Sequence, residues 1–222
     1  MKKTGTPGAI FDLDGVIVST DDCHTRAWKR LAEEEGIPFD GGSSDELRGV
    51  SRMESLEIIL KQAKRTYSEE EKKALAARKN DYYVAFISKL SPDDILPGVP
   101  GILTLLRNKG VRVAIGSSSR NTPLILRKIG LENAFDAVAD GNGITHSKPD
   151  PEVFLLAARL LGIPPERCLV VEDADAGIAA AAAGGMKALG VGFAAANMQA
   201  SYHAQSLADA DFEKILLDFE EE

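Results

Sequence analysis

Two aspartates one residue apart follow the first apolar run of the chain, residues 9–11. Asp12 and Asp14 stand where that run ends, and Gly15 comes directly after them. Side chains alternate along an extended chain, so residues i and i+2 point the same way and the two carboxylates should converge. Gly15 lets the chain turn sharply, because glycine adopts backbone angles that other residues avoid. One carboxylate could then attack a phosphorus atom while the other moves a proton, and a divalent cation would relieve their repulsion.

Taken alone, the Asp-x-Asp-Gly sequence also fits a solvated turn or a calcium-binding loop. The calcium interpretation is the weaker of the two, because apolar residues 16–18 follow where an EF-hand loop would supply further oxygen ligands. The residues in the rest of the chain are therefore needed to distinguish a solvated turn from a catalytic pair of carboxylates.

The elements that must position these carboxylates are apolar runs that alternate with helices. Strands are predicted at 9–11, 111–116, 137–139, 168–171 and 188–191, with the last taken as the final strand of the chain. From residue 98 onward a helix is expected between each strand and the next, and a terminal helix at 211–220. This alternation is typical of a Rossmann-like α/β fold, in which helices cover both faces of a parallel sheet.

Roughly a hundred residues separate the first predicted strand from the second, whereas a parallel crossover needs about a dozen. Helices account for the surplus: one begins near Ser19–Asp21 and ends at Gly36, one covers 53–64, and one starts with a capping box of Ser68 and Glu71. We therefore expect two domains. Residues 1–18 and 91–222 would form the α/β core, and residues 19–90 an inserted all-helical cap.

Polar side chains follow four of the predicted strands. In an open parallel sheet, ligands bind at the carboxyl ends of the strands, so these side chains should meet. They are Asp12 and Asp14 after the first strand, Ser117, Ser118 and Ser119 after the second, Lys148 after the third, and Glu172 and Asp173 after the fourth. Each group also has an ordinary explanation, namely a strand-to-helix turn, a surface lysine, or acids at a helix N-terminus. Their succession favours a phosphate site that combines metal ligands, hydroxyl donors and one cation.

In these motifs the sequence resembles the haloacid dehalogenase superfamily of phosphotransferases over essentially its whole length. The matching motifs are Asp12-Leu13-Asp14-Gly15, Ser117, Lys148-Pro149-Asp150 and Glu172-Asp173. The resemblance implies that Asp12 is a nucleophile that forms an aspartyl phosphate, that Asp14 is the general acid and base, and that Ser117 and Lys148 assist. It also implies Mg²⁺ as the cofactor, with four metal ligands: Asp12, Asp14 through its main-chain carbonyl, Glu172 and Asp173.

The cap segment resembles that of sugar-phosphate mutases in the same superfamily. This likeness implies interconversion of β-D-glucose 1-phosphate and D-glucose 6-phosphate through a 1,6-bisphosphate, with Arg52 on the far phosphate. The substrate-binding residues that it implies are Thr20, His24, Gly49, Val50, Arg52, Lys79, Ser118, Ser119, Arg120 and Asn121.

Alternatives stay open at this stage. Arg52 also fits a capping or surface arginine, and His24 also fits an ordinary, partly exposed helix residue. The same core would serve a sugar-phosphate phosphatase with a permissive cap, or a non-catalytic phosphosugar-binding module. The chain departs from the family pattern at Ser19, where an aspartate is frequent, and at Asp175, which adds a carboxylate near the expected metal site.

Composition argues against several other partners. The 222 residues carry a net charge of −8 and have no Lys/Arg-rich run, which argues against nucleic acid. No apolar stretch approaches the roughly 20 residues of a membrane span, and residues 1–5 lack the apolar segment of a signal peptide. Cys23 and Cys168 suggest no disulfide framework. We expect a cytoplasmic protein that acts on a small-molecule sugar phosphate, and the resemblance implies a monomer.

Overall fold

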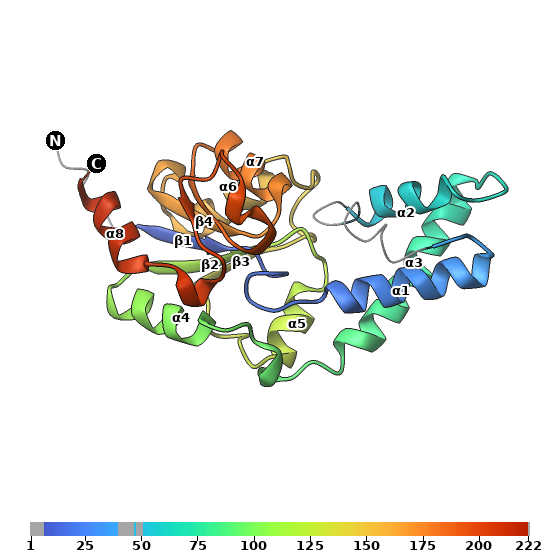
Figure 1. Cartoon of the computed structure of the whole chain (residues 1–222), viewed down its shortest axis with the longest axis horizontal. Helices are drawn as coiled ribbons and strands as arrows, with labels where there is room; N and C mark the ends of the chain where they lie inside the picture. Colours follow the sequence, from blue (N-terminus) through green and yellow to red (C-terminus); the bar gives the residue numbers. More distant parts are fainter. Residues whose placement is uncertain (1–6, 40–46, 48–50, 222) are drawn as a thin grey trace.

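A six-stranded parallel sheet forms the centre of the computed structural model, which describes residues 7–39, 47 and 51–221 (Figure 1). The strand order is β3-β2-β1-β4-β5-β6. The strands are β1 (Gly8–Phe11), β2 (Arg112–Gly116), β3 (Ala137–Ala139), β4 (Cys168–Glu172), β5 (Lys187–Gly190) and β6 (Tyr202–His203). The predicted Rossmann-like α/β class is confirmed.

Helices cover both faces of this sheet, and the alternation of side chains along β1 separates two apolar layers. Phe11 is buried in the layer that includes α4 (Val99–Asn108), α5 (Thr122–Lys128) and α8 (Phe212–Glu221). Ile10 is buried in the layer that includes α6 (Glu152–Leu161) and α7 (Asp175–Ala183). Figure 1 shows the two sets of helices on opposite sides of the sheet. Burial on both faces explains why β1 and β4 read as continuous apolar runs.

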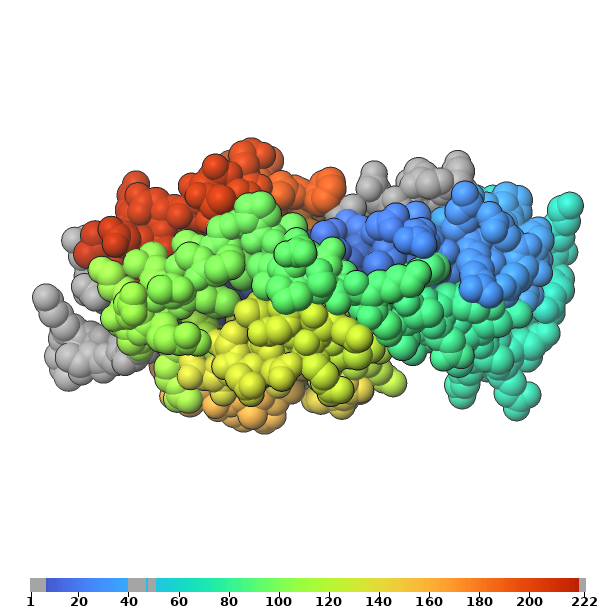
Figure 2. Space-filling view, turned by 90° about the horizontal axis from the view of Figure 1, so that it is seen from below, coloured from blue at the N-terminus to red at the C-terminus, as the bar shows by residue number. Residues whose placement is uncertain are grey.

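Three further helices extend from one end of the core (Figures 1 and 2). They are α1 (Asp21–Glu35), α2 (Arg52–Leu60) and α3 (Glu69–Ile87). They surround an apolar cluster of their own, formed by Trp28, Leu31, Ala32, Ile37, Leu56, Ile59, Leu75 and Ala76. This separate cluster supports the predicted division into core and cap, although the domain bounds themselves stay a prediction.

Short 3-10 helices complete the described elements: η2 (Pro92–Asp94), η3 (Pro165–Arg167), η4 (Gly192–Ala196) and η5 (Leu207–Asp209). Within the described residues, no helix is both long and apolar enough to cross a membrane.

Local sequence signals explain several helix ends. Ser68 accepts a hydrogen bond from the backbone N–H of Glu71, whose carboxylate accepts one from the N–H of Ser68, so the predicted capping box starts α3. Gly36 ends α1 in the left-handed conformation, with φ at 65°. Both ends lie where the sequence predicts them.

Two predictions about these elements were wrong, one on the end of a helix and one on the number of strands. The helix α2 ends at Leu60 instead of Lys64, because the N–H groups of Gln62 and Ala63 donate to carbonyls only three residues earlier and form turns. The strand β5 is not the last, because β6 pairs with it in parallel. A two-residue strand is too short to show an alternating pattern in the sequence.

Candidate active site

The carboxyl ends of the central strands open into a cavity of about 470 Å³ between the sheet and the cap helices. Phe11 of β1 lies beside Ile115 of β2 and Val171 of β4, so the residues that follow these strands come together. The core contributes Asp12, Asp14, Ser117, Ser118, Ser119, Arg120, Asn121, Lys148, Glu172 and Asp173 to its wall, and the cap contributes His24, Arg52 and Lys79. The predicted site residues thus meet in one cavity, apart from Thr20, which lies beside it, and from Gly49 and Val50, which lie outside the described residues.

Three buried acids form one cluster in this cavity. Carboxylate oxygens of Asp12, Glu172 and Asp173 lie within 4.8 Å of one another. Burial, reinforced by the charges of the other two acids, raises the pKa of Asp173 to about 8. Burial also raises the pKa of Glu172. Crowded carboxylate oxygens are hard donors of the type that Mg²⁺ prefers, so this cluster fits a divalent cation.

Lys148 partly neutralises the acid cluster. Its Nζ donates hydrogen bonds to Oδ1 of Asp12 at 2.6 Å and to Oε2 of Glu172 at 2.7 Å. Burial alone would lower the pKa of Lys148, but the two carboxylates outweigh burial and raise it. The lysine therefore stays charged and holds one oxygen of Asp12 in a defined position.

The side chain of Asp14 lies apart from the acid cluster and faces the start of the cap. Its carboxylate accepts hydrogen bonds from the backbone N–H of Thr20 at 2.6 Å and from the Thr20 hydroxyl at 2.5 Å. Burial raises the pKa of Asp14 to about 7 against these hydrogen bonds; because 32% of the side chain is exposed, water moderates the shift. A carboxyl group whose pKa is raised toward neutrality suits a role in which it gives and takes a proton.

Thr20 therefore plays a different part from the helix-capping role that its position suggests. It stands at the N-cap of α1, but its side chain makes no capping hydrogen bond. Its hydroxyl instead binds Asp14 and lies 2.9 Å from the hydroxyl of Tyr83 in α3. Thr20 thus links the core carboxylate to two cap helices. Tyr83 is not among the predicted site residues, although it lies on the same predicted helix as Lys79 and belongs to the segment that resembles the mutase cap.

Lys79, which is buried, and His24, whose side chain is 40% exposed, form a pair on the cap wall. Nζ of Lys79 lies 2.8 Å from Nδ1 of His24 and 4.6 Å and 4.8 Å from the ring centres of Trp28 and Tyr83. Burial lowers the pKa of Lys79 to about 7, and the nearby Arg52 adds to the shift. Burial also lowers the pKa of His24. Both shifts act against the charged form, so they reduce the positive charge that this pair adds to the cavity.

Two arginines also line the cavity. Arg52 is the first residue of α2 and reaches the cavity from the cap, whereas Arg120 follows β2 in the core. Burial lowers the pKa of Arg52, and the charge of Arg120 lowers it further. Two guanidinium groups close enough to affect one another favour a doubly charged anion between them.

The residues after β2 form both a turn and a polar wall. Ser117 Oγ accepts from the N–H of Ser119, and Ser119 Oγ accepts from the N–H of Asn121, as in an ordinary strand-to-helix turn. The Ser118 hydroxyl lines the cavity, where its oxygen is buried without a hydrogen-bond partner among the described residues. The turn explanation and the binding role are therefore compatible.

Asn80 is a contact between cap and core that the sequence-based residue set omits. Its side-chain oxygen accepts a hydrogen bond from the Asn121 amide at 3.0 Å. Its place next to Lys79 in the chain was the available signal.

The departure at Asp175 has a structural partner as well, because its carboxylate accepts a hydrogen bond from Asn197 at 2.6 Å.

Gly15 is required by both backbone angle and space. Its φ is 76°, and a Cβ there would lie 2.0 Å from a carboxylate oxygen of Asp173. We expect Gly15→Ala to destabilise the fold by about 1–3 kcal/mol through backbone strain and to weaken activity by displacing Asp173. Thermal unfolding and turnover measure the two effects. Gly36→Ala is the matched control, because φ there is 65° but nothing lies within 4 Å of the added Cβ. Unchanged activity in Gly15→Ala would contradict the prediction.

The parallel strands end at a buried acid cluster, a paired lysine and a second aspartate, next to inserted helices. This arrangement defines a phosphotransferase core. The sequence model of the haloacid dehalogenase-like hydrolase family matches residues 6–185, and the chain belongs to this family. The resemblance stated from the sequence motifs is confirmed.

The chain is similar to a β-phosphoglucomutase of Bacillus subtilis (strain 168), with 46% identity over 185 residues that cover 82% of each chain. It is also similar to a fructose-1-phosphate phosphatase of Escherichia coli (strain K12), with 33% identity, covering 83% of this chain and 95% of the relative. A crystal structure of β-phosphoglucomutase from Clostridium difficile superposes with a TM-score of 0.91 at 37% identity, covering 98% of each chain. The family thus contains both mutases and phosphatases with similar sequences.

Proposed function

We propose that the chain is a magnesium-dependent mutase that interconverts β-D-glucose 1-phosphate and D-glucose 6-phosphate through an aspartyl phosphate and a 1,6-bisphosphate. The observation that carries the proposal is a single cavity with cationic groups in two places. Lys148 lies beside Asp12 in the core, and Arg52 reaches the cavity from the cap, where the charge of Arg120 acts on it. A bisphosphate needs both places, and the volume of about 470 Å³ falls in the usual range for small-molecule sites.

In this mechanism Asp12 is the nucleophile. Lys148 holds its Oδ1, which orients the carboxylate toward the incoming phosphate. An oxygen of Asp12 forms a bond to phosphorus while the bond between phosphorus and the sugar oxygen breaks. Asp14 gives a proton to that sugar oxygen and removes one from the attacking hydroxyl in the reverse transfer. With β-D-glucose 1-phosphate the cycle starts from phosphorylated Asp12, which a trace of the bisphosphate supplies: the sugar's 6-hydroxyl bonds to phosphorus, the bond between phosphorus and Asp12 breaks, and the 1,6-bisphosphate forms. The bisphosphate then turns over, and transfer of its 1-phosphate to Asp12 releases glucose 6-phosphate and restores the aspartyl phosphate.

The acid cluster is the proposed metal site. Asp12, Glu172, Asp173 and the main-chain carbonyl of Asp14 would hold Mg²⁺, and the buried, mutually repelling carboxylates support this assignment. When bound, the cation supplies positive charge that offsets the charge of the transferred phosphoryl group.

The far phosphate would lie between Arg52 and Arg120. Charge-assisted hydrogen bonds from guanidinium groups suit phosphate oxygens, because the planar fork matches their geometry. The Ser118 hydroxyl, which has no hydrogen-bond partner in the part of the chain that the structure describes, and the amide of Asn121 line the same cavity and supply neutral donors. Retention of the sugar through this second site is what distinguishes a mutase from a phosphatase.

Hydrolysis of a sugar phosphate is the second candidate function, since the Escherichia coli relative is named a fructose-1-phosphate phosphatase. The deciding experiment supplies β-D-glucose 1-phosphate, Mg²⁺ and a trace of the 1,6-bisphosphate. We expect glucose 6-phosphate as the product. Release of glucose and free phosphate in its place would overturn the mutase proposal in favour of a phosphatase.

Removal of divalent cations should stop turnover. With excess chelator we expect a loss of activity that Mg²⁺ restores and Ca²⁺ restores poorly. Mg²⁺ requires near-octahedral geometry at short distances, whereas Ca²⁺ accepts more ligands at longer ones. The measurement is the initial rate after adding each cation to chelated enzyme. Full activity in excess chelator would remove the metal from the mechanism.

A further inference from the structure

Lys148 lies in a segment that has no helix or strand of its own. This segment, residues 140–151, joins β3 to α6, and the structure describes all of it. Nevertheless the Lys148 side chain is only 4% exposed and its Nζ makes two short ion pairs. An irregular segment loses much conformational entropy when it holds a side chain so closely. Specific contacts must therefore hold its backbone in place.

Glu152 provides such contacts. It is the first residue of α6, yet its carboxylate turns back toward the segment. Both carboxylate oxygens lie 3.0 Å from the N–H nitrogen of Thr145, and Oε2 accepts a hydrogen bond from the N–H of His146 at 2.6 Å. Oε2 also lies 3.2 Å from Nδ1 of His146. The N–H of Glu152 in turn donates to Oδ1 of Asp150 at 2.9 Å. Glu152 is thus bonded to residues on both sides of Lys148.

These contacts differ from ordinary helix capping. An acid in the first turn usually interacts with the N–H groups of its own helix. The carboxylate of Glu152 instead binds N–H groups six and seven residues earlier in the chain. These backbone bonds are the main reason that the pKa of Glu152 lies below its usual value. The carboxylate therefore connects the segment to α6 while it is charged.

The helix that carries Glu152 is firmly placed. Val153 and Phe154 follow directly and are both fully buried against the sheet. The ring centre of Phe154 lies 4.5 Å from Nζ of Lys148. The first turn of α6 therefore contacts the lysine at its ammonium group and holds the backbone that leads to it.

We propose that Glu152 is a positioning residue for Lys148: by binding the N–H groups of Thr145 and His146, it fixes the segment that brings Nζ to Asp12 and Glu172. The importance of this role for catalysis rests on the proposed function. The placement of Lys148 does not, so the two can be tested separately.

The first test measures how accessible Lys148 is. Lysines are labelled competitively with acetic anhydride without substrate, and the rate at each lysine is read by mass spectrometry. In Glu152→Ala we expect Lys148 to react about tenfold faster or more, because hydrogen bonds to a charged group are lost. In Glu152→Gln, which keeps one acceptor oxygen, the labelling rate of Lys148 should lie between the rates in Glu152→Ala and in the wild type.

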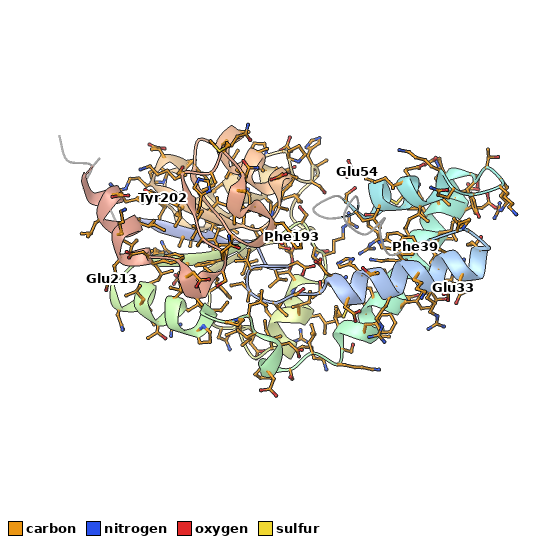
Figure 3. The ribbon with its side chains drawn as sticks, in the orientation of Figure 1. Glu33, Phe39, Glu54, Phe193, Tyr202 and Glu213 are labelled. Carbon is orange, nitrogen blue, oxygen red and sulfur yellow. The ribbon has the colours of Figure 1, made fainter. Side chains whose placement is uncertain are left out.

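Lys79 is the internal control, because it is 2% exposed but lies in the cap. Its labelling rate should not change in Glu152→Ala. Glu213→Ala is the matched variant, since Glu213 also lies in the first turn of a helix, α8, but at the end of the core away from the cap (Figure 3). An unchanged Lys148 rate in Glu152→Ala, or equal increases at Lys148 and Lys79, would overturn the proposal.

The second test is a double-mutant cycle on turnover. Glu152→Ala should lower kcat with little change in KM, and this loss should disappear in a Lys148→Ala background. A loss of equal size in both backgrounds would mean that Glu152 acts on stability and not through Lys148. Because labelling needs no substrate, it remains decisive even where the sugar-phosphate assignment fails.

Discussion

Asp12→Asn should reduce phosphoryl transfer by about 10⁴-fold or more. An amide cannot replace the carboxylate that attacks phosphorus, and losses of this size are typical when a nucleophile is removed. The substitution keeps the shape of the side chain, and Lys148 keeps its ion pair with Glu172. We therefore expect a folded protein whose thermal unfolding resembles that of the wild type. The measurements are single-turnover rates and formation of the aspartyl phosphate.

Asp175→Asn is the matched control for this experiment. It makes the same chemical change close to the acid cluster, but the Asp175 carboxylate binds Asn197 instead of belonging to that cluster. Its turnover should stay within a few-fold of the wild type, since only one hydrogen bond to a charged group is altered. Near-wild-type turnover in Asp12→Asn would show that another residue is the nucleophile.

Arg52→Ala should separate a mutase from a phosphatase when it is assayed on two substrates. In either orientation of a bisphosphate, one phosphate lies away from Asp12, where Arg52 reaches the cavity from α2. Each charge-assisted hydrogen bond contributes about 1.5–3 kcal/mol, so isomerisation should fall by about one to two decades per bond. Reaction of Asp12 with acetyl phosphate should change little, because this substrate has no second phosphate.

Arg65→Ala is the matched control in the cap. Arg65 pairs with Glu71 and is 54% exposed, and it does not line the cavity that contains Asp12. Its loss should leave both reactions near the wild-type rate, as expected for an exposed ion pair. Equal losses on both substrates in Arg52→Ala would place its effect on the core or on stability, and the second-phosphate role would be abandoned. No loss on either substrate would favour a phosphatase.

The sequence by itself determined the fold class and the order in which the polar candidate site residues follow the strands. The apolar strands and their polar successors are local features: buried strands between helices need continuous apolar runs, and ligands bind where such strands end. For the same reason the capping box at Ser68 and the glycine end of α1 were predictable, since the hydrogen bonds involved join residues only a few positions apart. The roles of Asp12, Asp14 and Lys148 stay predictions that their positions support.

Only the tertiary structure decided which side chains meet across long stretches of chain. A lysine is usually exposed, so nothing local predicts that Lys79 is buried between two aromatic rings beside His24, 55 positions earlier. Thr20 fits a helix cap locally, but the packing of α1 and α3 on the core directs its hydroxyl to Asp14 and Tyr83. Glu152 fits the acidic first turn of a helix, yet the path of the preceding segment brings two backbone N–H groups to its carboxylate. In each case local sequence allows several hydrogen-bond partners, and burial selects one, because a polar group without a partner is costly once water is excluded.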